Sequence, residues 1–160
     1  MSYLAALTFF HTAISLVAIV VGLVVVGGLL GATIQPYWTT LFLVTAIVTS
    51  ATGYLFPVSG LLPSHIVGAI ALVILAIVLL ARYSFHLAGA WRWIYAAGMV
   101  ASLYFLAFVG VVQAFLKIPA LHALAPNGNE APFAIAQVVL LVLCIAAGIA
   151  AARSWRPMAV

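Results

Sequence analysis

Long apolar runs, separated by short polar or proline-containing connections, form the main pattern of this sequence. Five of these runs are long enough for an α-helix that crosses the hydrocarbon core, which takes about 20 residues at about 1.5 Å per residue. We therefore expect membrane-spanning helices over residues 5–28, 37–56, 63–81, 91–116 and 133–152. The pattern predicts an all-α, polytopic membrane protein in which residues 1–160 form one compact transmembrane bundle.

The composition agrees with a surface that lies mostly in lipid. Hydrophobic residues make up 69% of the chain and charged residues only 4%, too few to cover a soluble domain. The net charge of +4 does not indicate nucleic-acid binding, because the basic residues are scattered rather than gathered in a phosphate-binding patch. The lone Cys144 excludes an internal disulfide and a cysteine-based metal motif. The expected partner of this surface is the lipid bilayer.

The basic residues also predict which way the bundle faces. Most of them belong to one side of the predicted bundle: Arg82, Arg92, Arg153 and Arg156. Only Lys117 belongs to the other side, so the positive-inside rule places the C-terminus in the cytoplasm and the N-terminus outside. The tryptophans, which favour the membrane interface, fall at the same cytoplasmic end: Trp38, Trp91, Trp93 and Trp155. The basic link around His86 is expected to contact lipid headgroups.

The connection over residues 117–132 is the one substantial loop, and it is external in this topology. It contains Glu130, the only acidic residue of the chain, and also His122. Apolar residues at roughly helical spacing around Pro119 predict a short helix lying in the membrane interface. Pro126, which is followed by an Asn-Gly pair, predicts a turn.

Polar side chains inside the predicted spans gather in the outer half of the bundle. Such residues are costly in hydrocarbon unless they find partners, so they mark candidate binding sites. The candidates for ligand binding are His11, Thr52, His65, Gln113 and Gln137. His11 is the strongest of them, because it lies well inside the first span with no charged neighbour in sequence. We expect a periplasm-facing polar pocket beneath the external loop that binds a small ligand or cofactor.

Several of these polar side chains also have a structural explanation. Thr45, Thr49 and Ser15 are expected to donate to a backbone carbonyl one turn earlier, as hydroxyls in membrane helices commonly do. Glutamines such as Gln113 and Gln137 brace neighbouring helices more often than they bind a ligand.

Three kinds of ligand fit this set of side chains. A quinone or similar amphipathic molecule ranks first, because it could accept hydrogen bonds here with its tail in lipid and needs no particular ligand geometry. A b-type haem could be held between His11 and His65, since histidine is a common axial ligand. A divalent metal would take its ligands from His11, His65, His122 and Glu130, although no two of these share a helix at i, i+3 or i+4.

Two functions without a ligand compete with this interpretation. One is a non-catalytic helical accessory subunit of a larger membrane complex. The other is a small transporter that works as a homo-oligomer, although the chain has no convincing inverted repeat and no charge in mid-membrane. The sequence offers no nucleophile–base pair, phosphate loop or paired carboxylates, so we do not expect an enzyme of the familiar hydrolytic kinds.

Two stretches resemble a group of small bacterial inner-membrane proteins with no assigned function. They are TGYLFPVSGLLPSHIVGAIALVILAIVLLARY (residues 52–83) and VVQAFLKIPALHALAPNGNEAPFAIAQ (residues 111–137). The second stretch is the more specific of the two. The resemblance implies a multi-pass protein of the bacterial inner (plasma) membrane, and it carries no binding or catalytic role over to any residue.

Overall fold

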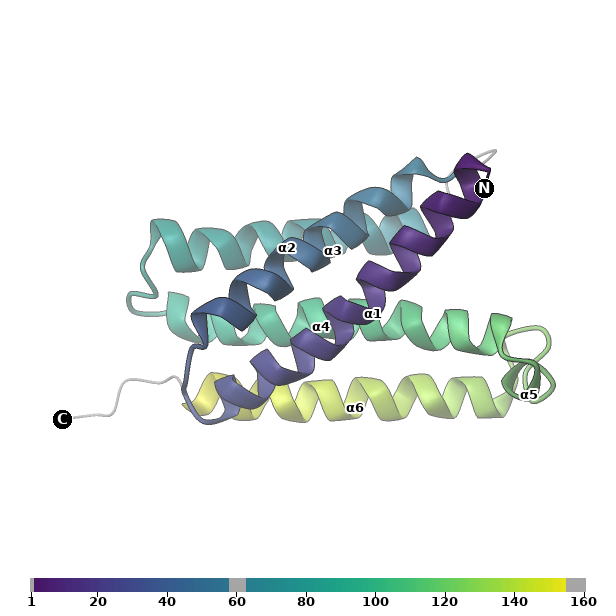
Figure 1. Ribbon diagram of the computed structural model, residues 1–160. Helices are drawn as coiled ribbons and strands as arrows, with labels where there is room; N and C mark the ends of the chain where they lie inside the picture. The colour runs from purple at the N-terminus through teal and green to yellow at the C-terminus, as the bar shows by residue number, and fades with distance from the viewer. Residues whose placement is uncertain (1, 58–62, 155–160) are drawn as a thin grey trace.

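The computed structural model describes residues 2–57 and 63–154, which contain helices and connections but no strand (Figure 1). Five helices in this part of the chain are long and apolar enough to cross a membrane. They are α1 (Tyr3–Leu30), α2 (Pro36–Thr52), α3 (Pro63–Leu79), α4 (Trp91–Lys117) and α6 (Ala131–Ser154). The expected all-α class and the five spans are confirmed, and together they indicate a multi-pass membrane protein.

Three shorter elements complete the described chain: the 3₁₀ turn η1 (Gly53–Leu55), the π-helical turn η2 (Leu80–Ser84) and the one-turn helix α5 (Pro119–His122). The first two extend α2 and α3 respectively. The third is the short helix expected in the loop. The expected turn follows it, with Gly128 at φ +73°, a backbone conformation that favours glycine.

Local signals explain where the long helices begin and end. Pro36 occupies the first turn of α2, where its missing N–H has no helical partner to lose. Ser2 precedes α1, and its hydroxyl oxygen accepts a hydrogen bond from the Ala5 N–H at 3.3 Å. At the other end of α1, the Thr33 N–H donates to the Gly28 carbonyl at 2.9 Å and turns the chain toward α2.

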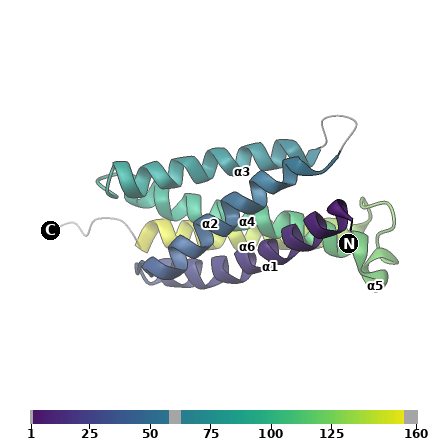
Figure 2. The ribbon, with the colours of Figure 1, turned by 45° about the horizontal axis from the view of Figure 1, so that its top comes forward.

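Helix α4 lies at the centre of the bundle. It contacts α1, α3 and α6, whereas α2 packs against α1 and α3. Helices α3, α4 and α6 run side by side, and α1 and α2 cross them obliquely (Figures 1 and 2). The side chains of Tyr95 and Met99 on α4 are fully buried, as expected for the central helix.

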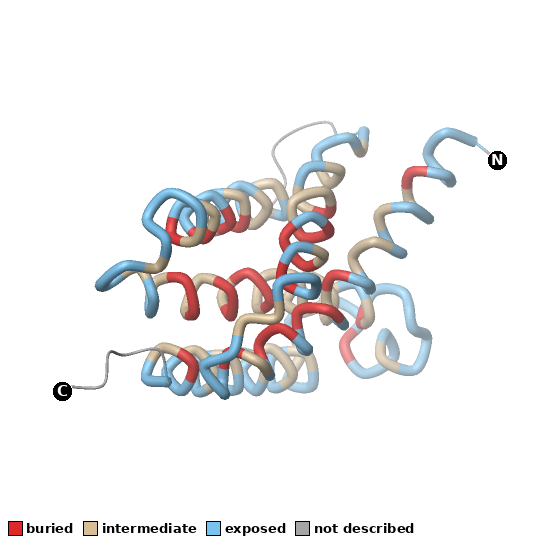
Figure 3. The backbone as a smooth tube through the Cα atoms, turned by 60° about the vertical axis from the view of Figure 1, so that its left-hand side comes forward, coloured by how far each residue is buried: buried red, intermediate tan, exposed pale blue. Residues whose placement is uncertain are grey.

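The main cluster of buried side chains, called the core below, lies in one half of the bundle's length. It is built from the later turns of α1 and α3 and the earlier turns of α2 and α4, with Leu29, Phe42, Val78 and Tyr95 among its members. Fewer residues are buried along the early turns of α1 (Figure 3). Phe9 on these turns is 71% exposed. The half that carries His11 therefore has few of the contacts that hold the other half together.

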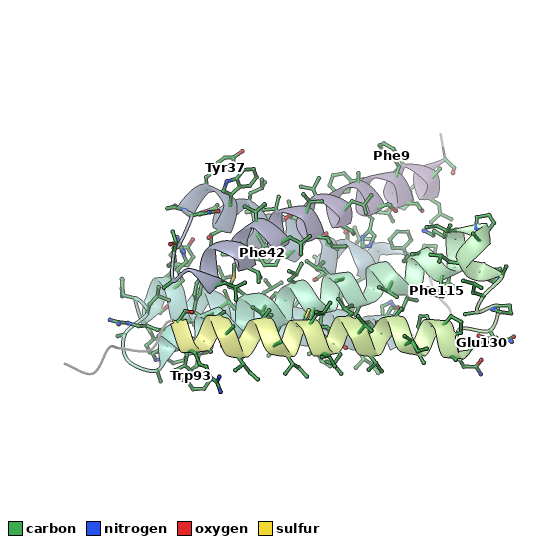
Figure 4. All side chains as sticks on the ribbon, turned by 90° about the horizontal axis from the view of Figure 1, so that it is seen from below. Phe9, Tyr37, Phe42, Trp93, Phe115 and Glu130 are labelled. Carbon is green, nitrogen blue, oxygen red and sulfur yellow. The ribbon has the colours of Figure 1, made fainter. Side chains whose placement is uncertain are left out.

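The two ends of the bundle differ in charge. The end at which α6 stops carries Arg82, Arg92 and Arg153, and it also carries the described tryptophans, with Trp93 labelled there in Figure 4. The opposite end carries Lys117 and Glu130. The predicted orientation of the termini rests on this difference in charge between the two ends, and it stays a prediction. Trp155 and Arg156, which also entered it, lie outside the described residues.

Candidate functional site

A hydrogen bond between α1 and α2 forms the centre of the candidate site. The Nδ1 atom of His11, which is partly buried, lies 2.8 Å from the Thr52 hydroxyl oxygen. The same hydroxyl oxygen lies 2.7 Å from the Val48 carbonyl oxygen, one turn back on α2. A hydroxyl has one proton, and a carbonyl can only accept, so Thr52 donates to Val48 and accepts from His11. A neutral His11 then carries its proton on Nδ1 and leaves the Nε2 lone pair as an acceptor.

Aromatic contacts fix the orientation of the His11 ring. The Phe56 ring meets it edge to face, with the centroids 5.3 Å apart at 85°. A Cβ atom built on Gly53 would lie 3.8 Å from His11 Cε1, so the imidazole rests against the end of α2. These contacts hold the imidazole in one position, because edge-to-face pairs are favourable in themselves.

His65 packs against the same segment from α3. Its ring stacks on Tyr54 with the centroids 5.3 Å apart at 16°, and the Tyr54 hydroxyl donates to the His65 carbonyl at 2.7 Å. The segment 52–56 therefore contacts both histidines, and each histidine has its own aromatic neighbour there. Sequence reasoning missed Phe56 and gave Tyr54 no role, because neither ring forms a motif with a histidine that is distant in sequence.

The two predicted glutamines do not join this pair. Gln113 is exposed on the surface of α4, and its expected role in ligand binding stays a prediction. Gln137 is partly buried, and its Nε2 donates to the Phe108 carbonyl of α4 at 3.3 Å. Gln137 therefore braces α6 against α4, the structural alternative expected for it.

Two of the three expected backbone hydrogen bonds of hydroxyl groups are confirmed. Ser15 donates to the His11 carbonyl at 2.6 Å, and Thr45 donates to the Leu41 carbonyl at 2.7 Å. Thr49 behaves differently, because its hydroxyl is buried and has no hydrogen-bond partner among the described residues. It lies on α2 one turn before Thr52, so the face of α2 that meets His11 carries an unsatisfied polar group.

The predicted metal ligands are not brought together. Within 2–57 and 63–154, no three His, Cys, Asp or Glu side chains form a group that could hold a metal ion. His122 is exposed on α5. The Glu130 carboxylate is occupied in its own turn, where it accepts hydrogen bonds from the side chain and backbone of Asn127 at 2.8 and 3.1 Å and from the Asn129 N–H at 3.1 Å.

The acid of this turn makes the loop sensitive to pH. A desolvation effect raises the pKa of Glu130, but the hydrogen bonds from Asn127 and Asn129 outweigh it, so the pKa lies below its usual value. A lowered pKa in the folded state stabilises the turn above the unfolded pKa of about 4.3, and this contribution is lost as the pH falls through the folded value.

We therefore expect amide protection of Asn127 and Asn129 to fall when the pH is lowered from about 7 to about 3, measured by hydrogen exchange and corrected for intrinsic rates. Glu130→Gln is the control, with low protection at both pH values. Equal protection of the wild type at the two pH values would contradict this role of Glu130.

An open hollow of about 600 Å³ runs along the early turns of α1. Its lining comes from this helix: Ser2, Leu4, Ala5, Thr8, Phe9 and Thr12. Three of these six residues are apolar, and the other three carry hydroxyl groups. An amphipathic molecule could therefore lie along this stretch of α1.

Comparison with protein-family models, with curated proteins and with solved structures gives no match to this chain.

Proposed function

We propose that this protein binds a small amphipathic ligand of the quinol class at the His11–Thr52 pair. The observation that carries the proposal is the hydrogen bond between His11 Nδ1 and a Thr52 hydroxyl that already donates to Val48. It leaves His11 Nε2 as an oriented acceptor inside a membrane span, where an unused polar atom is costly. A quinol hydroxyl would donate to this atom.

The loose packing around His11 supports the proposal. The buried core lies in the other half of the bundle, so a ring could enter between α1 and its neighbours without displacing core side chains. The unpartnered Thr49 hydroxyl offers a second polar contact one turn away. The hollow along α1 would take an apolar tail. In the orientation that we propose, with the N-terminus outside, this site faces the periplasm of a bacterial inner membrane.

A b-type haem is the closest competing ligand. A haem iron would bind the same Nε2 atom, and a ring N–H given to a hydrogen-bond partner is the usual second contact of an iron-binding histidine. Against a haem held between His11 and His65, each imidazole is packed on its own aromatic ring from segment 52–56. A visible absorption spectrum of the purified protein, oxidised and then reduced, separates the two ligands.

We expect His11→Ala to weaken the binding of decylubiquinol about tenfold, since the variant loses the hydrogen bond to Nε2. Thr52→Val should weaken binding less, because the imidazole remains and only the hydrogen bond that orients it is lost. The measurement is calorimetric titration of the detergent-purified protein. His122→Ala is the matched control, as it removes an exposed imidazole from α5.

Equal affinity of the wild type and His11→Ala for decylubiquinol would contradict the proposed site. A Soret band that disappears in His11→Ala would keep the site and change its ligand to haem. The absence of quinol binding together with a featureless spectrum would favour the accessory subunit. Helix α6 supports that alternative, because Ala151 is its only buried residue among those described and the rest of the helix could contact a partner. That function predicts co-purification with larger membrane partners.

A further inference from the structure

A second polar site lies at the opposite end of the bundle, around Arg82. The partly buried Arg82 Nη1 donates to the hydroxyl of the fully buried Tyr95 at 3.2 Å. Its Cζ atom lies 5.6 Å from the Tyr83 ring centroid and 6.0 Å from that of Tyr95. The guanidinium is thus held between two aromatic rings, a favourable place for a cation. A guanidinium has five N–H donors, so donors remain after the one given to Tyr95.

Arg82 faces a hollow of about 310 Å³, which is lined by Ile34, Arg82, Tyr83, His86 and Leu87. Arg82, Tyr83 and His86 supply the polar part of this lining. His86 is exposed and follows Arg82 by four residues. A positive charge and an imidazole therefore line the same recess.

No acidic side chain of this protein can neutralise Arg82. The only acid of the whole sequence is Glu130, and it lies at the other end of the bundle. Arg92 and Arg153 lie at the same end of the bundle and add further positive charge there. A group of cations at a membrane interface without any acid attracts an anion from outside the chain.

The backbone around this hollow is held in an unusual conformation. The π-helical turn η2 carries Arg82, and π-helical turns occur often at functional sites. The next two lining residues, His86 and Leu87, have φ values of +48° and +58°, which non-glycine residues adopt only with backbone strain. Hydrogen bonds hold this turn: the Leu87 N–H donates to Ala81 at 2.9 Å, and Arg92 Nε donates to the Leu87 carbonyl at 3.0 Å.

We propose that the Arg82–His86 hollow binds the phosphate of an anionic membrane phospholipid. The arginine fork matches the geometry of phosphate oxygens, and His86 offers a further donor. The surroundings favour a lipid over free phosphate, because the hollow lies at the end of the membrane-spanning helices beside the stacked Phe85 and Trp91 rings, whose centroids are 3.9 Å apart. Aromatic side chains of this kind are typical of the membrane interface.

The test is native mass spectrometry of the full chain in non-ionic detergent, titrated with short-chain phosphatidylglycerol. We expect Arg82→Gln to lower the affinity for this lipid about tenfold or more, because the variant loses charge-assisted hydrogen bonds to the phosphate. Arg153→Gln is the matched control, because it removes the same charge from an exposed position at the same end that does not line the hollow. It should change affinity little.

A second variant keeps the test independent of any folding defect in Arg82→Gln. His86→Gly relaxes the left-handed backbone and removes the imidazole, so the melting temperature in lipid-free detergent should rise while the affinity for phosphatidylglycerol falls. Equal losses in Arg82→Gln and Arg153→Gln would overturn the proposal, as would equal affinity for short-chain phosphatidylcholine. Competition by inorganic phosphate at the concentration of the lipid would also overturn it, since the lipid would then add nothing.

Discussion

Phe42→Ala is expected to destabilise the bundle by about 3 kcal/mol, the lower end of the range for such truncations. The Phe42 side chain is fully buried in the core on α2. The lower end applies because an unfolded membrane helix exposes the ring to lipid rather than to water, which reduces the transfer contribution. The contribution of the cavity left among α1, α2 and α4 is not reduced in this way. The measurement is the free energy of unfolding in mixed micelles titrated with a denaturing detergent.

Phe9→Ala is the matched control for this substitution. Phe9 is 71% exposed on α1, so the same truncation there leaves no cavity inside the protein. Its effect should stay within about 0.5 kcal/mol of the wild type. Similar effects of the two truncations would contradict a core confined to the half that contains Phe42.

Gly22→Ala is expected to destabilise the bundle by about 1–3 kcal/mol, as overpacked cores do. A Cβ atom on Gly22 would lie 2.7 Å from the Phe42 ring and 2.8 Å from Leu103 Cδ1, closer than real contacts allow. Helices α1, α2 and α4 approach one another at this glycine, and in lipid such close packing is a main source of helix association. The same unfolding titration measures the loss.

Gly27→Ala provides the comparison within the same helix. A Cβ atom there meets nothing within 4 Å, so the substitution should be neutral or should stabilise by up to about 1 kcal/mol through helix propensity. If the Gly22→Ala variant unfolds with the same free energy as the Gly27→Ala variant, the three helices do not approach closely at Gly22.

The positions of the helices could be predicted from the sequence because a long apolar run has few alternatives in lipid. Every backbone group must be paired inside the segment, so the run becomes a helix of bilayer length. Depth along a helix follows in the same way, from a fixed rise per residue. The expected loop helix was confirmed on similar grounds, since Pro119 sits at its start.

The facing of the polar side chains could not be predicted, because rotation about the helix axis depends on packing between helices. Gln113, for example, is exposed on α4, which its position along the helix does not indicate. Thr49 is one turn from Thr52 and yet lacks the carbonyl partner that Ser15 and Thr45 find. Spacing along a single chain does not contain this information.

Contacts between distant aromatic and polar residues were also beyond the sequence. Phe56 and Tyr54 contact the two histidines only because the 3₁₀ turn after α2 presents them to α1 and α3. Arg82 was read as a marker of orientation, and its place beside the buried Tyr95 depends on the π-helical turn at the end of α3. Neither turn has a recognisable sequence signal.

The confinement of the core to one half divides the bundle into two parts of unequal cooperativity. The part around Phe42 and Tyr95 must open as one unit, because its buried side chains span four helices and the last turn of α6. The early turns of α1 have few such contacts, so they can separate from α2 at a small fraction of the global unfolding free energy. A lipid-dissolved molecule could therefore reach His11 sideways from the bilayer, through a fluctuation of one helix end that leaves the rest of the protein folded.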